Sequence, residues 1–248
     1  MMIIVTMFVL GVVLGFIGAG GSGFIIAVLV TFFDIPIYHA LGTAAAVMFL
    51  SVLTGSWSHF REGNLILKQG LFIGFFGSVG SYVGTRMTKI IDPEILMYFT
   101  VTALVLSGLM IWLKTRLNLE HSAAEEVQLY PLRSSIIGLG NGMISGTFGI
   151  GAAPFIQLSL LKWLGYPMFA AAGTTMLVLI PISLAAALGF MQNGFFDSSL
   201  FLKVALGTIV GSYIGAKLTK RLPRIILRYG MVVTPVVSAM LLLIHQLD

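Results

Sequence analysis

Long apolar runs with very few charges restrict what this chain can fold into more than any other feature does. They cover residues 2–33, 39–58, 68–91, 95–113, 131–163, 169–191, 199–219 and 225–245. Several reach the roughly 20 residues that an α-helix needs to cross a hydrocarbon layer of about 30 Å. Of all residues, 58% are hydrophobic and 9% are charged, whereas a soluble domain carries about 25% charged residues. The sequence therefore predicts an all-α polytopic membrane protein in a lipid bilayer.

The charges and the cysteine content exclude several classes of function. The net charge of +5 comes from short clusters between the apolar runs, which is typical of cytoplasmic loops and not of a nucleic-acid interface. The chain has no cysteine, so it can form neither a disulfide nor a thiolate metal site. It has no G-x-S-x-G or H-E-x-x-H motif, and no apolar run contains a pair of carboxylates. We therefore expect no enzyme activity, no metal and no cofactor.

The chain consists of two copies of one unit. A shift of 131 residues superimposes the halves without a gap, and residue types with special roles coincide. The coincidences include Gly18 with Gly149, Gly20 with Gly151, Pro36 with Pro167, Gly42 with Gly173, Thr43 with Thr174, Gly80 with Gly211, Gly84 with Gly215 and Tyr98 with Tyr229. Apolar composition alone does not place Gly, Pro, Thr and Tyr in one register. The sequence predicts a first transmembrane repeat at 1–113 and a second at 131–248.

Residues 114–130 form a polar linker between the repeats. Ser122 followed by Glu125 fits a capping box and is consistent with a short surface helix, while a flexible tether fits equally well. The Gly80-xxx-Gly84 spacing and its counterpart in the second half predict close helix packing, because small residues four apart let membrane helices approach each other.

The first segment of each half is interrupted by glycine. Residues 2–33 would extend nearly 50 Å as one helix, at about 1.5 Å per residue, and Gly18-Ala19-Gly20-Gly21-Ser22-Gly23 lies in their middle. The second half has Gly149-Ile150-Gly151-Ala152-Ala153-Pro154 at the same place. Inside a membrane, unpaired backbone is tolerated only where it is buried in protein or lines a cavity. Interrupted segments at corresponding positions of two halves indicate the binding site of a transporter.

Each interrupted segment can either cross once as a discontinuous helix or return as a hairpin. With single crossings, the 14 Lys and Arg residues divide six against eight between the two sides, which favours neither orientation. With a hairpin in each half, three of them (Arg86, Lys89 and Lys203) oppose the other eleven. We favour the hairpin. It predicts two inverted repeats, each starting with a Gly-interrupted broken or re-entrant helix, and both termini outside the cytoplasm.

In the inverted arrangement the two breaks meet near the middle of the bilayer and present backbone amides. Such amides carry a partial positive charge and bind anions without a formal countercharge. The backbone candidates for a binding site are Gly20, Gly21, Gly23, Gly151 and Ala152. The polar side-chain candidates are Ser22, Thr43, Asn141, Gln157, Thr174 and Thr175, for each of which the alternative is a bond to its own helix carbonyl.

Four basic residues are candidates for a gate or a proton path. His59 and Arg61 end the second segment, and a histidine near a pore can carry protons at physiological pH. Arg86 and Lys217 occupy equivalent positions and, in inverted halves, would attract anions at opposite mouths. The alternatives are an interfacial histidine and basic side chains that extend toward the headgroups at helix ends.

The order of these motifs resembles the TauE/SafE family of sulfite exporters and organosulfur-anion permeases. The resemblance rests on the Gly-rich break, the following Pro, the Gly-Thr pair and the turn His59-Phe60-Arg61-Glu62-Gly63-Asn64, and it covers nearly the whole chain. The family's Gly-Gly-Gly break is present as Gly20-Gly21-Ser22 and as Gly151-Ala152-Ala153, and the His-x-Arg turn is absent from the second half. The resemblance implies transport of sulfite, sulfonates or sulfoacetate across the bacterial inner membrane.

We therefore expect a multi-pass secondary transporter, an exporter of small sulfur-containing anions, that binds a small oxyanion between the two repeats. Two other hypotheses remain open at this point, a passive anion channel and a non-transporting scaffold subunit. The sequence indicates neither the anion, the coupling ion nor the oligomeric state.

Overall fold

Every regular element in the described part of the chain is a helix. The computed structural model describes residues 1–17, 21–63, 65–116, 130–219 and 224–247. The helices are α1 (Met2–Ile17), α2 (Ser22–Phe33), α3 (Ile37–Arg61), α4 (Leu67–Thr88), α5 (Pro93–Arg116), α6 (Pro131–Phe148), α7 (Ala153–Trp163), α8 (Met168–Gln192), α9 (Ser198–Thr219) and α10 (Arg224–Leu247). The predicted linker helix around Ser122 and the predicted site residue Gly20 lie outside the described residues.

Five of the described helices are long and apolar enough to cross a membrane: α3, α5, α8, α9 and α10. Large apolar side chains also cover the outer surface, with Phe75 64% exposed and Leu206 58% exposed. A soluble surface does not carry so many large apolar side chains, whereas a surface in contact with lipid does. The prediction of a helical, multi-pass membrane protein is confirmed.

The helix that follows the glycine break in each half is short, as the sequence predicts. α2 has 12 residues and α7 has 11, which gives each a length of roughly 16–18 Å at 1.5 Å per residue. Neither can cross a hydrocarbon layer of about 30 Å. α2 ends at Phe33, the next residue, Asp34, is left-handed (φ 50°), and Pro36 then precedes α3. Pro167 precedes α8 in the same way.

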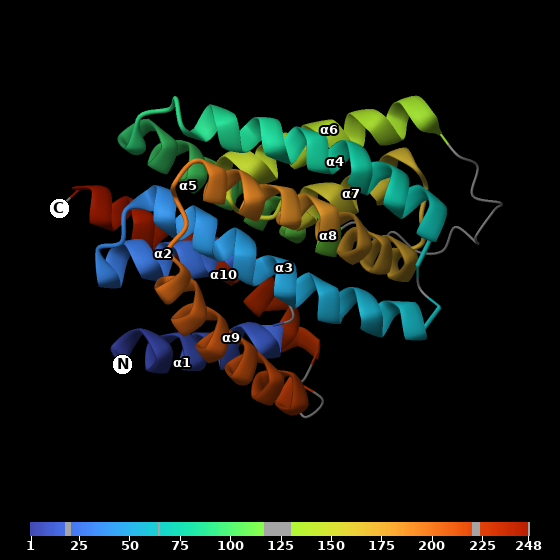
Figure 1. Ribbon diagram of the computed structural model, residues 1–248. Helices are drawn as coiled ribbons and strands as arrows, with labels where there is room; N and C mark the ends of the chain where they lie inside the picture. The colour runs from blue at the N-terminus through green and yellow to red at the C-terminus, as the bar shows by residue number, and fades with distance from the viewer. Residues whose placement is uncertain (18–20, 64, 117–129, 220–223, 248) are drawn as a thin grey trace.

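The helix bounds repeat along the chain. A shift of 131 residues carries the bounds of α3, α4 and α5 onto those of α8, α9 and α10, and the start of α2 onto the start of α7. The packing is reciprocal as well. α4 of the first half packs on α6 of the second, and α9 of the second half packs on α1 of the first. Figure 1 shows these pairs on opposite flanks, with α3 and α8 between them.

Glycines allow both outer pairs to pack with their backbones in contact. A methyl group on Gly142 of α6 would overlap the backbone of Gly77 in α4, and one on Gly80 would overlap Leu139. In the other pair, a methyl group on Gly11 of α1 would come within 2.6 Å of the Thr208 carbonyl oxygen in α9. Real side chains do not approach backbone so closely, so these seams require glycine. The predicted role of the Gly-xxx-Gly spacing in packing is confirmed at Gly80.

Candidate functional site

A cavity of about 250 Å³ lies where α2 and α7 begin. Both glycine breaks contribute to its wall, together with the middle of α5 and α10 and the start of α8. The lining residues are Gly21, Gly23, Phe24, His59, Leu104, Ser107, Met110, Ile111, Ile150, Ala153, Pro154, Gln157, Ala172, Thr175, Met176, Met231, Thr234, Pro235 and Ser238. Pockets for drug-sized ligands measure about 300–1,000 Å³, so this cavity suits a smaller solute.

The first turns of α2 and α7 face the cavity. In α2 the amides of Phe24 and Ile25 donate to the carbonyl of Gly21, and in α7 the amide of Ile156 donates to the carbonyl of Ala152. The earlier N–H groups, those of Ser22 and Gly23 in α2 and of Ala153 and Phe155 in α7, have no carbonyl in their own helix to pair with, since Pro154 has no N–H and neither helix has a side-chain cap. Unpaired amides and the positive end of the helix dipole therefore lie on two sides of one cavity.

The two breaks differ in backbone conformation although they occupy equivalent positions. The residue before α2 is Gly21 with φ −81°, whereas the residue before α7 is Ala152 with φ 46°. Gly151 is also left-handed, with φ 74°. An alanine in this region is strained, and such strain is concentrated at functional sites. A methyl group on Gly151 would lie 3.5 Å from Oγ of Ser22, which shows that the breaks are adjacent.

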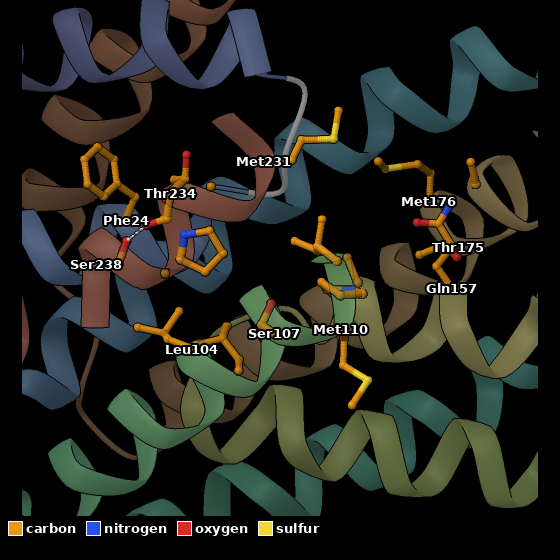
Figure 2. Close-up of a pocket in the computed structure, with 18 of the residues that line it drawn as sticks. Phe24, Leu104, Ser107, Met110, Gln157, Thr175, Met176, Met231, Thr234 and Ser238 are labelled. Carbon is orange, nitrogen blue, oxygen red and sulfur yellow. Dashed lines mark hydrogen bonds between the residues drawn. The ribbon is translucent and has the colours of Figure 1, made fainter. Parts of the chain in front are cut away.

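Two serines on the long helices around the cavity correspond to each other in the repeat. Ser107 lies on α5 and Ser238 on α10, and both line the wall. The Ser238 hydroxyl donates to the carbonyl of Thr234 at 2.8 Å, whereas the Ser107 hydroxyl has no hydrogen bond among the described residues. Figure 2 shows the Ser107 oxygen directed between the Thr234 and Gln157 sides of the cavity. The sequence reasoning missed this pair, and the signal for it was serine at equivalent positions of two apolar helices.

Four predicted binding residues line the cavity: Gly21, Gly23, Gln157 and Thr175. The Thr175 hydroxyl donates to the Ala171 carbonyl of its own helix at 2.7 Å, so its oxygen remains available mainly as an acceptor. In Figure 2, Gln157 and Thr175 lie together on the side opposite Thr234 and Ser238. The first turns of the two short helices thus line one cavity together with the start of α8.

The other predicted binding residues lie outside the lining. Ser22, Gly151 and Ala152 are next to it, and the Ser22 hydroxyl is buried without a hydrogen-bond partner among the described residues. The Thr43 hydroxyl is likewise buried and unpaired there. Thr174, the equivalent of Thr43, has a structural contact instead, because its Oγ1 accepts a hydrogen bond from the Ile66 amide at 3.2 Å.

Asn141 also has a local contact. Its Nδ2 donates to the Ile137 carbonyl of its own helix at 2.8 Å, and the side chain is buried on α6 away from the cavity lining. This is the back-bonded alternative that the sequence left open for each polar residue.

The four basic candidates separate in the structure. His59 lines the cavity, and its Nδ1 lies 3.8 Å from a carboxylate oxygen of Glu62. Arg61 is exposed at the end of α3. Arg86 lies outside the cavity lining and is hydrogen-bonded to the end of α8. The side chain of Lys217 lies outside the described part of the chain.

The cavity combines apolar walls with neutral hydrogen-bond donors. His59 is the one ionisable side chain among the described lining residues, which include no lysine, arginine or carboxylate. A charged lysine or arginine in the bilayer costs about 2.5–3.5 kcal/mol on insertion scales. Amides and hydroxyls supply positive potential without that cost, so the arrangement can hold a small anion and accommodate an apolar group attached to it.

Comparison with known proteins gives one consistent result. A family model described as Sulfite exporter TauE/SafE matches residues 3–242. The chain is 43% identical to the "Probable membrane transporter protein YdhB" of Bacillus subtilis over 98% of this chain and 100% of the relative. It is 26% identical to the "Probable membrane transporter protein MJ0441" of Methanocaldococcus jannaschii over 89% of this chain and 86% of the relative. No solved structure matches. The chain therefore belongs to the TauE/SafE family of membrane transporters.

Proposed function

We propose that this protein transports small sulfur-containing anions, such as sulfite or organosulfonates, out of the cell across the bacterial cytoplasmic membrane. The anion binds in the cavity between the first turns of α2 and α7. The observation that carries the proposal is the convergence of both helix starts on one cavity whose described lining has no acidic side chain. Cations gain nothing from the positive ends of helix dipoles, whereas anions do.

The proposed site suits an oxyanion with one diffuse charge. Its donors are the first amides of two helices and the hydroxyl of Ser107, which is not engaged elsewhere among the described residues. Sulfite and sulfonate groups each have three oxygens that can accept such bonds. The apolar side of the cavity, with Leu104, Met110 and Met231, accommodates the carbon part of an organosulfonate.

The proposed transport mechanism is alternating access between two inverted repeats. Two facts support the inversion: the equivalent helices α1 and α6 begin at opposite ends of the molecule (Figure 1), and the inverted topology divides the basic residues three against eleven. A two-fold relation of this kind brings the two glycine breaks next to each other near the middle of the bilayer, as in other transporters with inverted repeats. The halves would then expose the cavity to each side in turn.

A ligand-stabilisation screen of the purified protein tests the binding step. Binding raises the thermal unfolding temperature by mass action, so sulfite and small sulfonates should raise it as their concentration rises. Potassium chloride and choline chloride at matched ionic strength are the controls. If sulfur oxyanions have no more effect than these salts, the proposed substrate class is wrong.

Counterflow in proteoliposomes then tests transport. A transporter loaded with unlabelled anion on one side accelerates entry of labelled anion from the other. A passive channel gives flux without this acceleration, and a scaffold subunit gives no flux at all. Either result contradicts the proposed mechanism.

A further inference from the structure

The reciprocal packing of the two halves is broken at one pair of contacts. α4 follows α8 closely along its length, whereas their counterparts α9 and α3 diverge (Figure 1). In the close pair, Ser81 is buried and its hydroxyl donates to the Ile182 carbonyl of α8 at 2.9 Å. Its counterpart Ser212 donates to the Ile209 carbonyl of its own helix at 3.0 Å. The same unit therefore adopts two packing arrangements within one molecule.

A polar cluster joins α4 to α8 at the carboxyl ends of the two helices. Arg86 of α4 donates through Nη2 to Oε1 of Gln192 at 2.8 Å and to the Tyr82 hydroxyl at 2.7 Å. The Tyr82 hydroxyl also donates to Oε1 of Gln192, at 2.7 Å. Asn193, which follows α8, donates to the Thr85 carbonyl at 2.7 Å. The charged guanidinium thus joins two helices of different halves, because Nη2 donates to Gln192 and Nη1 lies 3.4 Å from Oδ1 of Asn193.

This cluster and the cavity lie toward opposite ends of the molecule. Arg86 and Gln192 are at the carboxyl ends of α4 and α8, whereas the cavity wall includes His59 in the last turn of α3 and Thr175 near the start of α8. In Figure 1, the carboxyl end of α3 and the start of α8 are on the side opposite the carboxyl ends of α4 and α8. The cavity is thus set toward the end where α3 and α9 diverge.

We propose that Arg86, Tyr82, Gln192 and Asn193 form a latch that keeps the cavity closed on the non-cytoplasmic side, and that the latch opens during transport. The proposal rests on the transport function proposed above. In a molecule with two equivalent helix pairs, closing α3 against α9 and parting α4 from α8 exchanges the two arrangements and moves the opening to the other side. The basic-residue count puts Arg86 on the non-cytoplasmic face.

Thiol labelling tests the latch without requiring a substrate. The chain has no cysteine, so Ser107→Cys is a unique reporter in the cavity. A membrane-impermeant maleimide should label it in inside-out vesicles and hardly at all in right-side-out vesicles. Adding Arg86→Ala should raise labelling from outside by roughly two- to fivefold, because the hydrogen bonds lost from the closed state are solvent-exposed and contribute modestly. Gln192→Leu, which removes the shared acceptor and keeps the cation, should act in the same direction.

Lys89→Ala is the matched control, because it removes an exposed cation from the same end of α4 and leaves the cluster intact. Outside labelling that is unchanged by Arg86→Ala and Gln192→Leu overturns the latch, and so does an equal rise with Lys89→Ala. Since labelling reports only opening, the proposed substrate can be wrong while the latch is right, and the reverse also holds.

A reversible cross-link gives a second test. A methyl group on Gly189 of α8 would lie 2.8 Å from Cβ of Thr85 in α4, so cysteines at these two positions are close enough for a disulfide after a small adjustment. Oxidation of Thr85→Cys/Gly189→Cys should stop counterflow, and reduction should restore it. Each single-cysteine variant should be insensitive to oxidant. Full counterflow in the oxidised double variant would show that α4 and α8 do not part.

Discussion

Ser107 and Ser238 show how one unit can give two different side-chain environments. Both serines line the cavity, but the Ser238 hydroxyl is bonded to its own helix and the Ser107 hydroxyl is not, among the residues described. We expect Ser107→Ala to weaken anion binding tenfold or more, because a hydrogen bond to a charged group contributes roughly 1.5–3 kcal/mol. The measurement is the dissociation constant of the purified variant from anion-dependent thermal stabilisation.

Ser238→Ala is the matched control for Ser107→Ala. It removes the same atoms from the equivalent position, but its hydroxyl already has a backbone partner, so anion affinity should change by less than about twofold. Equal losses in the two variants would mean that the site uses both repeats alike. No loss in either would place the anion away from α5 and α10.

The sequence predicted only some of the residues that line the cavity. The duplicated breaks led to Gly21 and Gly23, since an interrupted membrane helix must be buried or line a cavity. The Gly-Thr pair was a weaker guide. Oγ1 of Thr174 accepts a hydrogen bond from the amide of Ile66, the residue before α4, and that partner lies 108 residues away in the chain. Long-range contacts of this kind leave no periodic signal in a single sequence.

The α4–α6 seam is the element-scale feature that depends most on residue size. Gly142 of α6 faces the backbone of Gly77, so a methyl group there must push the helices apart. We expect Gly142→Ala to lower the free energy of unfolding by about 1–3 kcal/mol, the usual cost of overpacking. Thermal unfolding of the purified variant in detergent measures the change.

Gly140→Ala is the comparison variant for Gly142→Ala on the same helix. A methyl group on Gly140 meets nothing within 4 Å, so the substitution should leave stability unchanged or raise it by up to about 1 kcal/mol through helix propensity. A loss of stability at Gly140 as large as that at Gly142 would mean that overlap with the α4 backbone does not determine the result.

Helix positions were predictable because membrane helices are limited by length and by breakers. The Gly-rich stretches and Pro36 divided the chain at the points where α2 and α3 begin. The divergence of α9 from α3 could not be predicted in this way. The repeat makes α9 equivalent to α4, so the sequence pattern predicts the same packing for both. The structure instead packs α4 against α8 and leaves α9 apart from α3.

The two-fold relation of the halves is the property of the whole molecule on which the proposed mechanism depends. Lys68 and Ser199 are the second residues of α4 and α9, both are exposed, and the 131-residue shift carries one onto the other. If the repeats are inverted, these residues lie on opposite faces of the membrane, with Lys68 on the cytoplasmic face that carries most basic residues. If the repeats are parallel, both lie on one face.

Single cysteines at these two positions decide between the topologies. We expect a membrane-impermeant maleimide to label Ser199→Cys and not Lys68→Cys in right-side-out vesicles, and the opposite in inside-out vesicles. Detergent-solubilised protein, in which both should react, is the control for intrinsic reactivity. Labelling of both cysteines from the same side would exclude inversion, and with it any transport cycle in which α4–α8 and α3–α9 exchange roles across the membrane.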